Sequence, residues 1–312
     1  MGKVVSFFRA YKMLVVLIVM AAVMGAASPF FLTSANAINV LRQASSYGII
    51  ACGITFAIIS GEFDLSVGST MSLCGLVSIL AEPAFGQIPA ILLALLAGFA
   101  VGLLNGVLIA KAHINSFIVT IGSMGLVKGI ALKISNGTPV ISSNAWFGEI
   151  GNGAVAGIPN LAVFFIATAL FSSCCLSRTR FGRNVYAVGG NKEVARNNGV
   201  DVEFHKTAAF VISSLTAAIA GVLLASRLNT GSALYGDNAA LFVISGVVIG
   251  GTSLCGGVGN IPMSVIGIFI FTLITNSLDL LRVYSYYQTV IRGVLLMLII
   301  GMDAFTRTRR ER

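Results

Sequence analysis

The chain has 312 residues, of which 56% are hydrophobic and only 10% are charged, whereas ordinary soluble domains carry about a quarter charged residues. Such a chain cannot bury its apolar surface within one globule, which excludes a soluble protein and leaves room for about eight to ten apolar segments of roughly 20 residues. The net charge of +9 does not indicate a nucleic-acid partner, because the basic residues are scattered between apolar segments.

The N-terminal segment has the charge pattern of a signal peptide. Lys3, Arg9 and Lys12 precede an apolar run, and Ala35-Asn36-Ala37 has the small residues of a weak cleavage site. The apolar run covers residues 13–32, however, whereas the apolar region of a signal peptide has only about 7–15 residues. We therefore expect an uncleaved first transmembrane helix.

Further apolar windows follow along the chain. Because a bilayer offers no hydrogen bonds to the backbone, each window must be helical or be sheltered by protein. The second and eighth windows are short for a complete crossing, which takes about 20 residues. The sequence thus predicts an all-α integral membrane protein in which residues 1–312 form one domain of about ten transmembrane helices, with eight as the alternative. The windows after the first are 44–60, 65–81, 88–110, 114–133, 158–176, 207–227, 239–251, 260–281 and 284–302.

The distribution of the 20 Lys and Arg residues predicts the orientation, because basic loops stay on the cytoplasmic side. An even number of helices places both termini in the cytoplasm and most basic residues on the inner side. The long outer loop at 134–157 then has no Lys or Arg. The outer set is Arg42, Lys133, Arg227 and Arg282. The inner set is Lys3, Arg9, Lys12, Lys111, Arg178, Arg180, Arg183, Lys192, Arg196, Lys206, Arg307, Arg309, Arg310 and Arg312.

Cysteine and glycine are expected to serve helix packing. All 5 cysteines lie in or beside apolar windows and none forms a C-x-x-C pair, so we interpret them as small apolar packing residues. The 35 glycines recur inside the windows as well as between them, and small residues let transmembrane helices approach closely.

Two carboxylates, Glu62 and Asp64, lie between the second and third windows, where charges at membrane depth are costly unless they are compensated. Two interpretations of Asp64 stay open. Asp64 precedes an apolar helix, so its carboxylate can cap the unpaired N–H groups of Ser66 or Val67; alternatively, it contacts a transported molecule or a gate. Glu62 has no capping geometry and is the stronger candidate to face a pathway. The candidate pathway or gate residues are Glu62, Asp64, Asn105 and Asn276.

The one long loop on the predicted inner side covers residues 178–206, and it contains a short helix with a capping signal at each end. Asn191 is the expected N-cap, and Gly199 is the expected terminator about two turns later. With small side chains at Val194 and Ala195, this helix can fit into the groove of a partner protein. The alternative is a solvated helix that has no partner.

The segment Gly250–Asn260 is rich in glycine, as phosphate-binding loops are. It lacks the lysine that the G-x-x-x-x-G-K-[ST] pattern requires, and no strand precedes it. We interpret it as a tight hairpin between two helices. Any ATP hydrolysis must then occur on another polypeptide.

Lys128 and Arg292 lie inside windows, and Asp279 and Arg282 lie near the end of one. Charges in spans should face protein or water, and Arg282 is placed to reach the interface by snorkelling.

The two histidines, His113 and His205, lie beside lysines at predicted inner ends, which is typical of interface residues rather than of a proton relay. No Ser/His/Asp, Cys/His or metal-ligand constellation is present, so we expect no catalytic residue, no metal and no cofactor.

Four ordered motifs together resemble the permease subunits of the ribose, xylose, galactose and autoinducer-2 class of ATP-binding-cassette importers, and the likeness covers most of the chain. The motifs are Asp64-Leu65-Ser66-Val67-Gly68-Ser69, Arg180-Phe181-Gly182-Arg183 leading to Ala187-Val188-Gly189-Gly190-Asn191, Gly250-Gly251-Thr252-Ser253-Leu254 with Gly256-Gly257, and Ser285-Tyr286-Tyr287-Gln288.

This resemblance implies a pair of permeases, identical or not, in the bacterial cytoplasmic membrane. Two cytoplasmic ATPase domains that bind ATP and Mg and an external sugar-binding protein would complete the importer. The helix Lys192–Asn198 then looks like the coupling helix, with Glu193, Ala195 and Gly199 matching the family's contact motif. Val194 departs from that motif, which usually has alanine at this position. The coupling residues implied are Gly189, Gly190, Asn191, Glu193, Ala195 and Gly199.

Other departures from the family pattern concern the substrate. The family usually has glycine where Glu62 stands, prolines where Asn115 and Ser116 stand, and acidic residues where Ala240 and Phe242 stand. If the family's acidic residues shape a polar route, their replacement by Ala240 and Phe242 points to an atypical substrate or to a non-identical partner permease.

The predicted function is therefore that of the permease subunit of an ATP-driven importer for a monosaccharide or a related small carbohydrate. The alternative from another class is a secondary, ion-coupled transporter, which would hold carboxylates at mid-span and broken helices in one chain. A membrane scaffold is the third possibility, and it does not account for the loop helix.

Overall fold

The computed structural model describes residues 12–308, so Lys3, Arg9, Arg309, Arg310 and Arg312 of the predicted inner set lie outside the described part. The helices are α2 (Lys12–Ala27), α3 (Ser34–Ile59), α4 (Val67–Leu80), α5 (Glu82–Phe85), α6 (Gln87–Ala110), α7 (Ser116–Ile134), α8 (Ala145–Asn152), α9 (Asn160–Arg178), α10 (Arg180–Gly190), α11 (Lys192–Asn197), α12 (Val202–Leu228), α13 (Ala239–Ile249), α14 (Ile261–Leu280) and α15 (Ser285–Thr308). The strands are β1 (Val140–Ile141), β2 (Ala154–Val155), β3 (Ile158–Pro159) and β4 (Thr230–Gly231).

Each apolar window of the sequence coincides with a helix, so the all-α fold class is confirmed. The largest difference is α3, which begins at Ser34 rather than at 44. Thr33 stops the helix from fraying there, because its side chain accepts a hydrogen bond from the Asn36 N–H at 3.3 Å. Within the described residues, five helices are long and apolar enough to cross a membrane by length and composition, namely α6, α7, α9, α12 and α14.

Helix α12 is the centre of the bundle, where it packs against α3, α4 and α6. Its most apolar window is 67% buried, whereas those of α6, α7 and α9 are 28% buried. Three glycines of α6 spaced by four residues, Gly98, Gly102 and Gly106, face α12. A Cβ atom at Gly102 would lie 2.8 Å from the Phe210 carbonyl oxygen, so only glycine permits this approach of the two helices.

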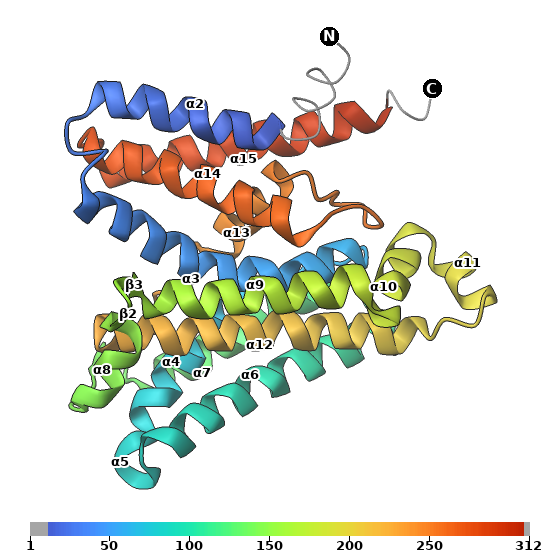
Figure 1. Ribbon diagram of the computed structural model, residues 1–312. Helices are drawn as coiled ribbons and strands as arrows, with labels where there is room; N and C mark the ends of the chain where they lie inside the picture. The colour runs from blue at the N-terminus through green and yellow to red at the C-terminus, as the bar shows by residue number, and fades with distance from the viewer. Residues whose placement is uncertain (1–11, 309–312) are drawn as a thin grey trace.

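The bundle has two different ends (Figure 1). The short helices α5 and α8 and the hairpin of β2 and β3 lie at the left end in this view, and α10 and α11 form the right end. The described start of α2 and the end of α15 both point to the end that carries α11. The two small antiparallel sheets pair Val140 with Gly231 and Ala154 with Pro159.

Helix α13 is short because the segment before it enters the bundle as irregular backbone. Gly236 packs so closely on Gly68 that a Cβ atom there would overlap the Gly68 carbonyl oxygen. The Gly236 N–H donates to the Ser72 Oγ at 2.8 Å. Protein therefore supplies the hydrogen bond that lipid cannot, which is the condition for non-helical backbone at membrane depth.

Candidate functional site

The loop at 178–206 folds into two helices, α10 and α11, and the predicted capping of α11 is confirmed. The Asn191 Oδ1 accepts hydrogen bonds from the Glu193 and Val194 N–H groups at 3.0 and 3.1 Å. Gly199 has a φ of +79°, a left-handed conformation that suits glycine after a helix. Gly189 and Gly190 end α10, a helix that the sequence prediction missed although Thr179 caps it through the Gly182 N–H at 3.1 Å.

The side chains of α11 are arranged differently from the sequence prediction. Ala195 is only 3% exposed and packs against Val188 and Val202 inside the loop's own small core, so its side chain is not available to a partner's groove. Val194 is 55% exposed. The apolar group that α11 presents on the surface is therefore Val194, which the motif comparison had singled out as a departure.

The glycine-rich segment connects α13 to α14 as a hairpin, and it forms a junction with α10. The Gly257 N–H donates to the Ile59 carbonyl oxygen at 2.8 Å, and Gly189 of α10 packs on both groups. The Tyr186 hydroxyl donates to the Gly259 carbonyl oxygen at 2.6 Å, and burial raises the pKa of Tyr186. This loop junction, made by Ile59, Tyr186, Gly189, Gly257 and Gly259, joins the loop to α3 and to the α13–α14 hairpin.

Asp64 is fully buried, and its carboxylate accepts the expected hydrogen bond from the Ser66 N–H at 3.0 Å. The Ser66 and Ser213 hydroxyls also donate to it, at 2.6 and 2.8 Å. Asn105 joins the same cluster, because its Nδ2 donates to the Ser66 Oγ at 2.9 Å. Ser66 is the N-cap residue of α4 and no side chain caps the helix, so Asp64 does not cap the first turn itself. Its satisfied carboxylate holds Ser66 in place and ties the start of α4 to α12.

Glu62 forms an ion pair with Lys206, and the two side chains are 13% and 15% exposed. Lys206 lies in the second turn of α12, just after the loop that contains α11. Three of the four predicted pathway residues, Glu62, Asp64 and Asn105, therefore lie around the start of α4. Asn276 lies elsewhere, in the cavity described next.

A polar cavity of about 370 Å³ lies between α3, α12 and α14. Asn36 and Asn276 frame it through a reciprocal pair of amide hydrogen bonds at 3.1 and 2.8 Å. The Asp279 Oδ1 accepts from the Gln288 Nε2 at 2.8 Å. The cavity is lined by Asn36, Asn39, Gln43, Ser46, Tyr47, Met71, Leu224, Arg227, Asn276 and Asp279.

The sequence carried a signal for this cavity that our prediction did not use. Asn36, Asn39, Gln43 and Ser46 are spaced by three or four residues, which is a polar stripe along one face of a helix. The predicted second window began at 44, so most of the stripe was assigned to a loop.

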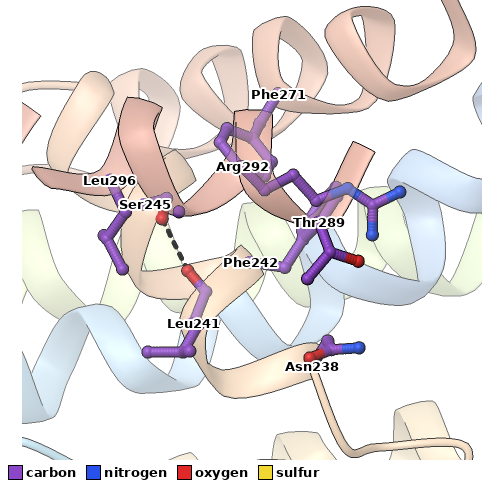
Figure 2. Close-up of a pocket in the computed structure, with 9 residues that line it drawn as sticks. Asn238, Leu241, Phe242, Ser245, Phe271, Thr289, Arg292 and Leu296 are labelled. Atoms are coloured by element: carbon purple, nitrogen blue, oxygen red, sulfur yellow. Dashed lines mark hydrogen bonds between the residues drawn. The ribbon is translucent and has the colours of Figure 1, made fainter. Parts of the chain in front are cut away.

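A second, apolar pocket of about 160 Å³ lies between α13, α14 and α15 (Figure 2). Leu241 and Leu296 lie on one side of it and Arg292 and Thr289 on the other. The Phe242 ring stacks on the Tyr47 ring with centroids 4.2 Å apart, so an aromatic wall stands between this pocket and the polar cavity.

Both cations predicted inside spans have protein partners. The Arg292 guanidinium donates to the Gln288 Oε1 at 2.8 Å. The Lys128 Nζ and the Asp237 Oδ1 form an ion pair at 2.7 Å. This is the arrangement that charges at membrane depth require.

Apolar helices long enough to cross a membrane, with a polar cavity at one end of the bundle and a folded polar loop at the other, fit a multi-pass membrane permease. The family described as branched-chain amino acid transport system, permease component, matches residues 36–300. The ribose import permease protein RbsC of Escherichia coli strain K12 is 36% identical over 303 residues, which cover 96% of this chain and 94% of RbsC. The chain belongs to this permease family and is a multi-pass protein of the inner membrane.

Two further relatives are permeases named for other sugars. The D-allose transport system permease protein AlsC of the same strain is 35% identical over 300 residues, with 95% of this chain and 92% of AlsC covered. The xylose transport system permease protein XylH, also of Escherichia coli strain K12, is 34% identical over 342 residues, which cover 89% of this chain and 87% of XylH. No solved structure gave a significant match.

Proposed function

We propose that the chain is the membrane-spanning permease subunit of an ATP-driven importer that carries a monosaccharide into the cytoplasm. Relatives named for ribose, allose and xylose support the substrate class. The observation that carries the ATP-driven mechanism is α11, a capped helix that exposes Val194 while its other side is fixed to the loop by Ala195.

In this proposal residues 1–312 form one domain of ten transmembrane helices with both termini in the cytoplasm, and 178–206 is the cytoplasmic coupling loop. Helix α11 lies at the same end of the bundle as the start of α2 and the end of α15, which supports this topology (Figure 1). The partners are an ATPase subunit that binds ATP and Mg, a second permease copy and an extracytoplasmic sugar-binding protein.

The ATPase would act on the permease through α11. A displacement of α11 would reach α12 through the packing of Ala195 on Val202, and it would reach α3 through the loop junction and the Glu62–Lys206 ion pair. Alternating access then arises from a tilt of these helices, since packed elements switch between discrete arrangements rather than deform continuously.

A secondary, ion-coupled transporter is the alternative, and the buried carboxylate of Asp64 is the observation in its favour. The three hydrogen bonds that Asp64 accepts satisfy it without a coupling ion. Uptake into proteoliposomes that contain the complete importer should therefore depend on ATP and persist when an ionophore collapses the ion gradients. Uptake that follows the gradients without ATP would establish the alternative.

The test of coupling is Val194→Glu, which places a charge on the exposed apolar group of α11. Binding of the ATPase would then have to desolvate an unpaired carboxylate, so the ATPase should co-purify less and uptake should fall. Val155→Glu is the matched control, because Val155 is 62% exposed at the opposite end of the bundle. If Val194→Glu retained as much ATPase as Val155→Glu, α11 would not be the docking element.

A further inference from the structure

The polar side chains around the cavity form two groups. Those of one group are hydrogen-bonded within the protein, and those of the other have free hydrogen-bond donors and acceptors. Asn36, Asn276 and Asp279 have side-chain partners within the protein. Among the described residues, the side chains of Asn39, Gln43 and Arg227 make no hydrogen bond, although all three line the cavity. Two amides and a guanidinium therefore offer planar donor and acceptor groups to whatever occupies the space.

The position of the cavity fits the arrival of a substrate. It is formed by the first turns of α3 and the last turns of α12 and α14, at the end of the bundle opposite α11 (Figure 1). Tyr47, Leu224 and Met71 of α4 also line it. The cavity thus lies at the end that the predicted topology places outside, whereas Ile50 and Ile54, further along α3, are fully buried.

We propose that this cavity is a binding site for a single monosaccharide ring inside the permease itself, with Asn39, Gln43 and Arg227 as the residues that select it. The inference rests on the proposed function, since it names where the permease holds its substrate. The volume of about 370 Å³ falls within the range of about 300–1,000 Å³ that is usual for small-molecule sites.

The chemistry of the lining favours a carbohydrate over a branched-chain amino acid, the substrate in the family's description. Each hydroxyl of a sugar both donates and accepts, as an amide side chain does. A branched aliphatic side chain would strip water from these amides without replacing the hydrogen bonds, which is unfavourable. The Tyr47 ring, held by stacking on Phe242, adds one rigid apolar surface for the C–H face of a ring.

The experiment uses the complete importer in proteoliposomes with radiolabelled D-ribose, D-allose, D-xylose and L-leucine as probes. Gln43→Leu replaces one selecting amide by an apolar side chain of similar volume. Asn39→Ser removes the other selecting amide and leaves a smaller polar side chain. Thr168→Leu, a polar-to-leucine change on α9 away from the cavity, is the control. Loss of one hydrogen bond to the sugar should raise the apparent KM about 3- to 10-fold and change the relative rates of the three sugars. ATPase association should stay unchanged.

Each outcome has a defined meaning. If sugar is transported and both cavity variants keep the KM and sugar preference of Thr168→Leu, the site is refuted while the proposed function stands. If the importer carries leucine and none of the three sugars, the substrate class and the site are both refuted. If Gln43→Leu lowers protein abundance, Asn39→Ser decides alone, and a higher KM with altered preference supports the site.

Discussion

Gly189 and Gly190 are adjacent at the end of α10, yet substitution of one and not the other should damage the protein. A Cβ atom at Gly189 would overlap the Ile59 carbonyl oxygen and lie 2.8 Å from the Gly257 backbone nitrogen. A Cβ atom at Gly190 would have no atom within 4 Å. Both residues have helical backbone, so Gly189→Ala and Gly190→Ala differ in their contacts and not in backbone strain.

The expected magnitudes follow from these contacts. Alanine gains up to about 1 kcal/mol over glycine in a helix interior, and an extra methyl group in a well-packed site costs about 1–3 kcal/mol. Gly190→Ala should be neutral or slightly stabilising, because nothing opposes the gain. Gly189→Ala should be less stable than Gly190→Ala by about 1–3 kcal/mol, because Ile59 and Gly257 are joined by a hydrogen bond and cannot both move aside.

The assay compares thermal unfolding of the purified variants in detergent with sugar uptake in cells. A difference of about 2 kcal/mol corresponds to a Tm lower by roughly 4–8 °C on the scale of large soluble domains. Uptake by Gly189→Ala should also fall, because the added methyl group separates α10 from Ile59 and Gly257 within the loop junction. Equal Tm and equal uptake for the two variants would refute the reasoning that this junction is closely packed and transmits motion.

Two other expectations follow from the fold and from the hydrogen bonds of Asp64. Cysteines introduced at 134–157 should be labelled from outside intact cells and those at 178–206 only after permeabilisation, in a background without the exposed Cys174 and Cys255; the opposite pattern would invert the proposed topology. Asp64→Asn should keep most of the transport, because an amide oxygen still accepts from Ser66 and the Ser213 hydroxyl can turn to accept instead. Asp64→Ala leaves buried donors unpaired, which lowers the stability by about 1–3 kcal/mol for each donor, so this variant should unfold at a lower temperature. Complete loss of uptake in both variants at normal abundance would indicate a functional carboxylate.

Features that depend on neighbouring residues could be predicted from the sequence. The caps of α11 at Asn191 and Gly199 are local, since each acts within one turn of its own position. The hydrogen bond from the Ser66 N–H to Asp64 is local for the same reason. The helical windows were equally accessible, because apolar length alone identifies them.

Features that depend on distant residues could not be predicted in this way. The Glu62–Lys206 ion pair joins positions 144 apart in the chain, and no sequence pattern connects them. Ala195 was expected at the partner's surface, but the packing of α11 on Val188 and Val202 buries it. The cavity was missed for a different reason, because the polar stripe from Asn36 to Ser46 was divided between a loop and a window.

The two ends of the molecule are joined by α3 and α12, which contact each other along the bundle. Helix α12 has 27 residues and is therefore about 40 Å long. Its first turns carry Val202, which packs on Ala195 of α11, and Lys206, which pairs with Glu62, and its last turn carries Arg227 in the polar cavity. A tilt of α12 driven at α11 would consequently move Arg227 relative to α14. If the proposed ATPase drives this tilt and thereby changes the affinity for a sugar by some factor, thermodynamic linkage requires that the sugar change the affinity for the ATPase by the same factor.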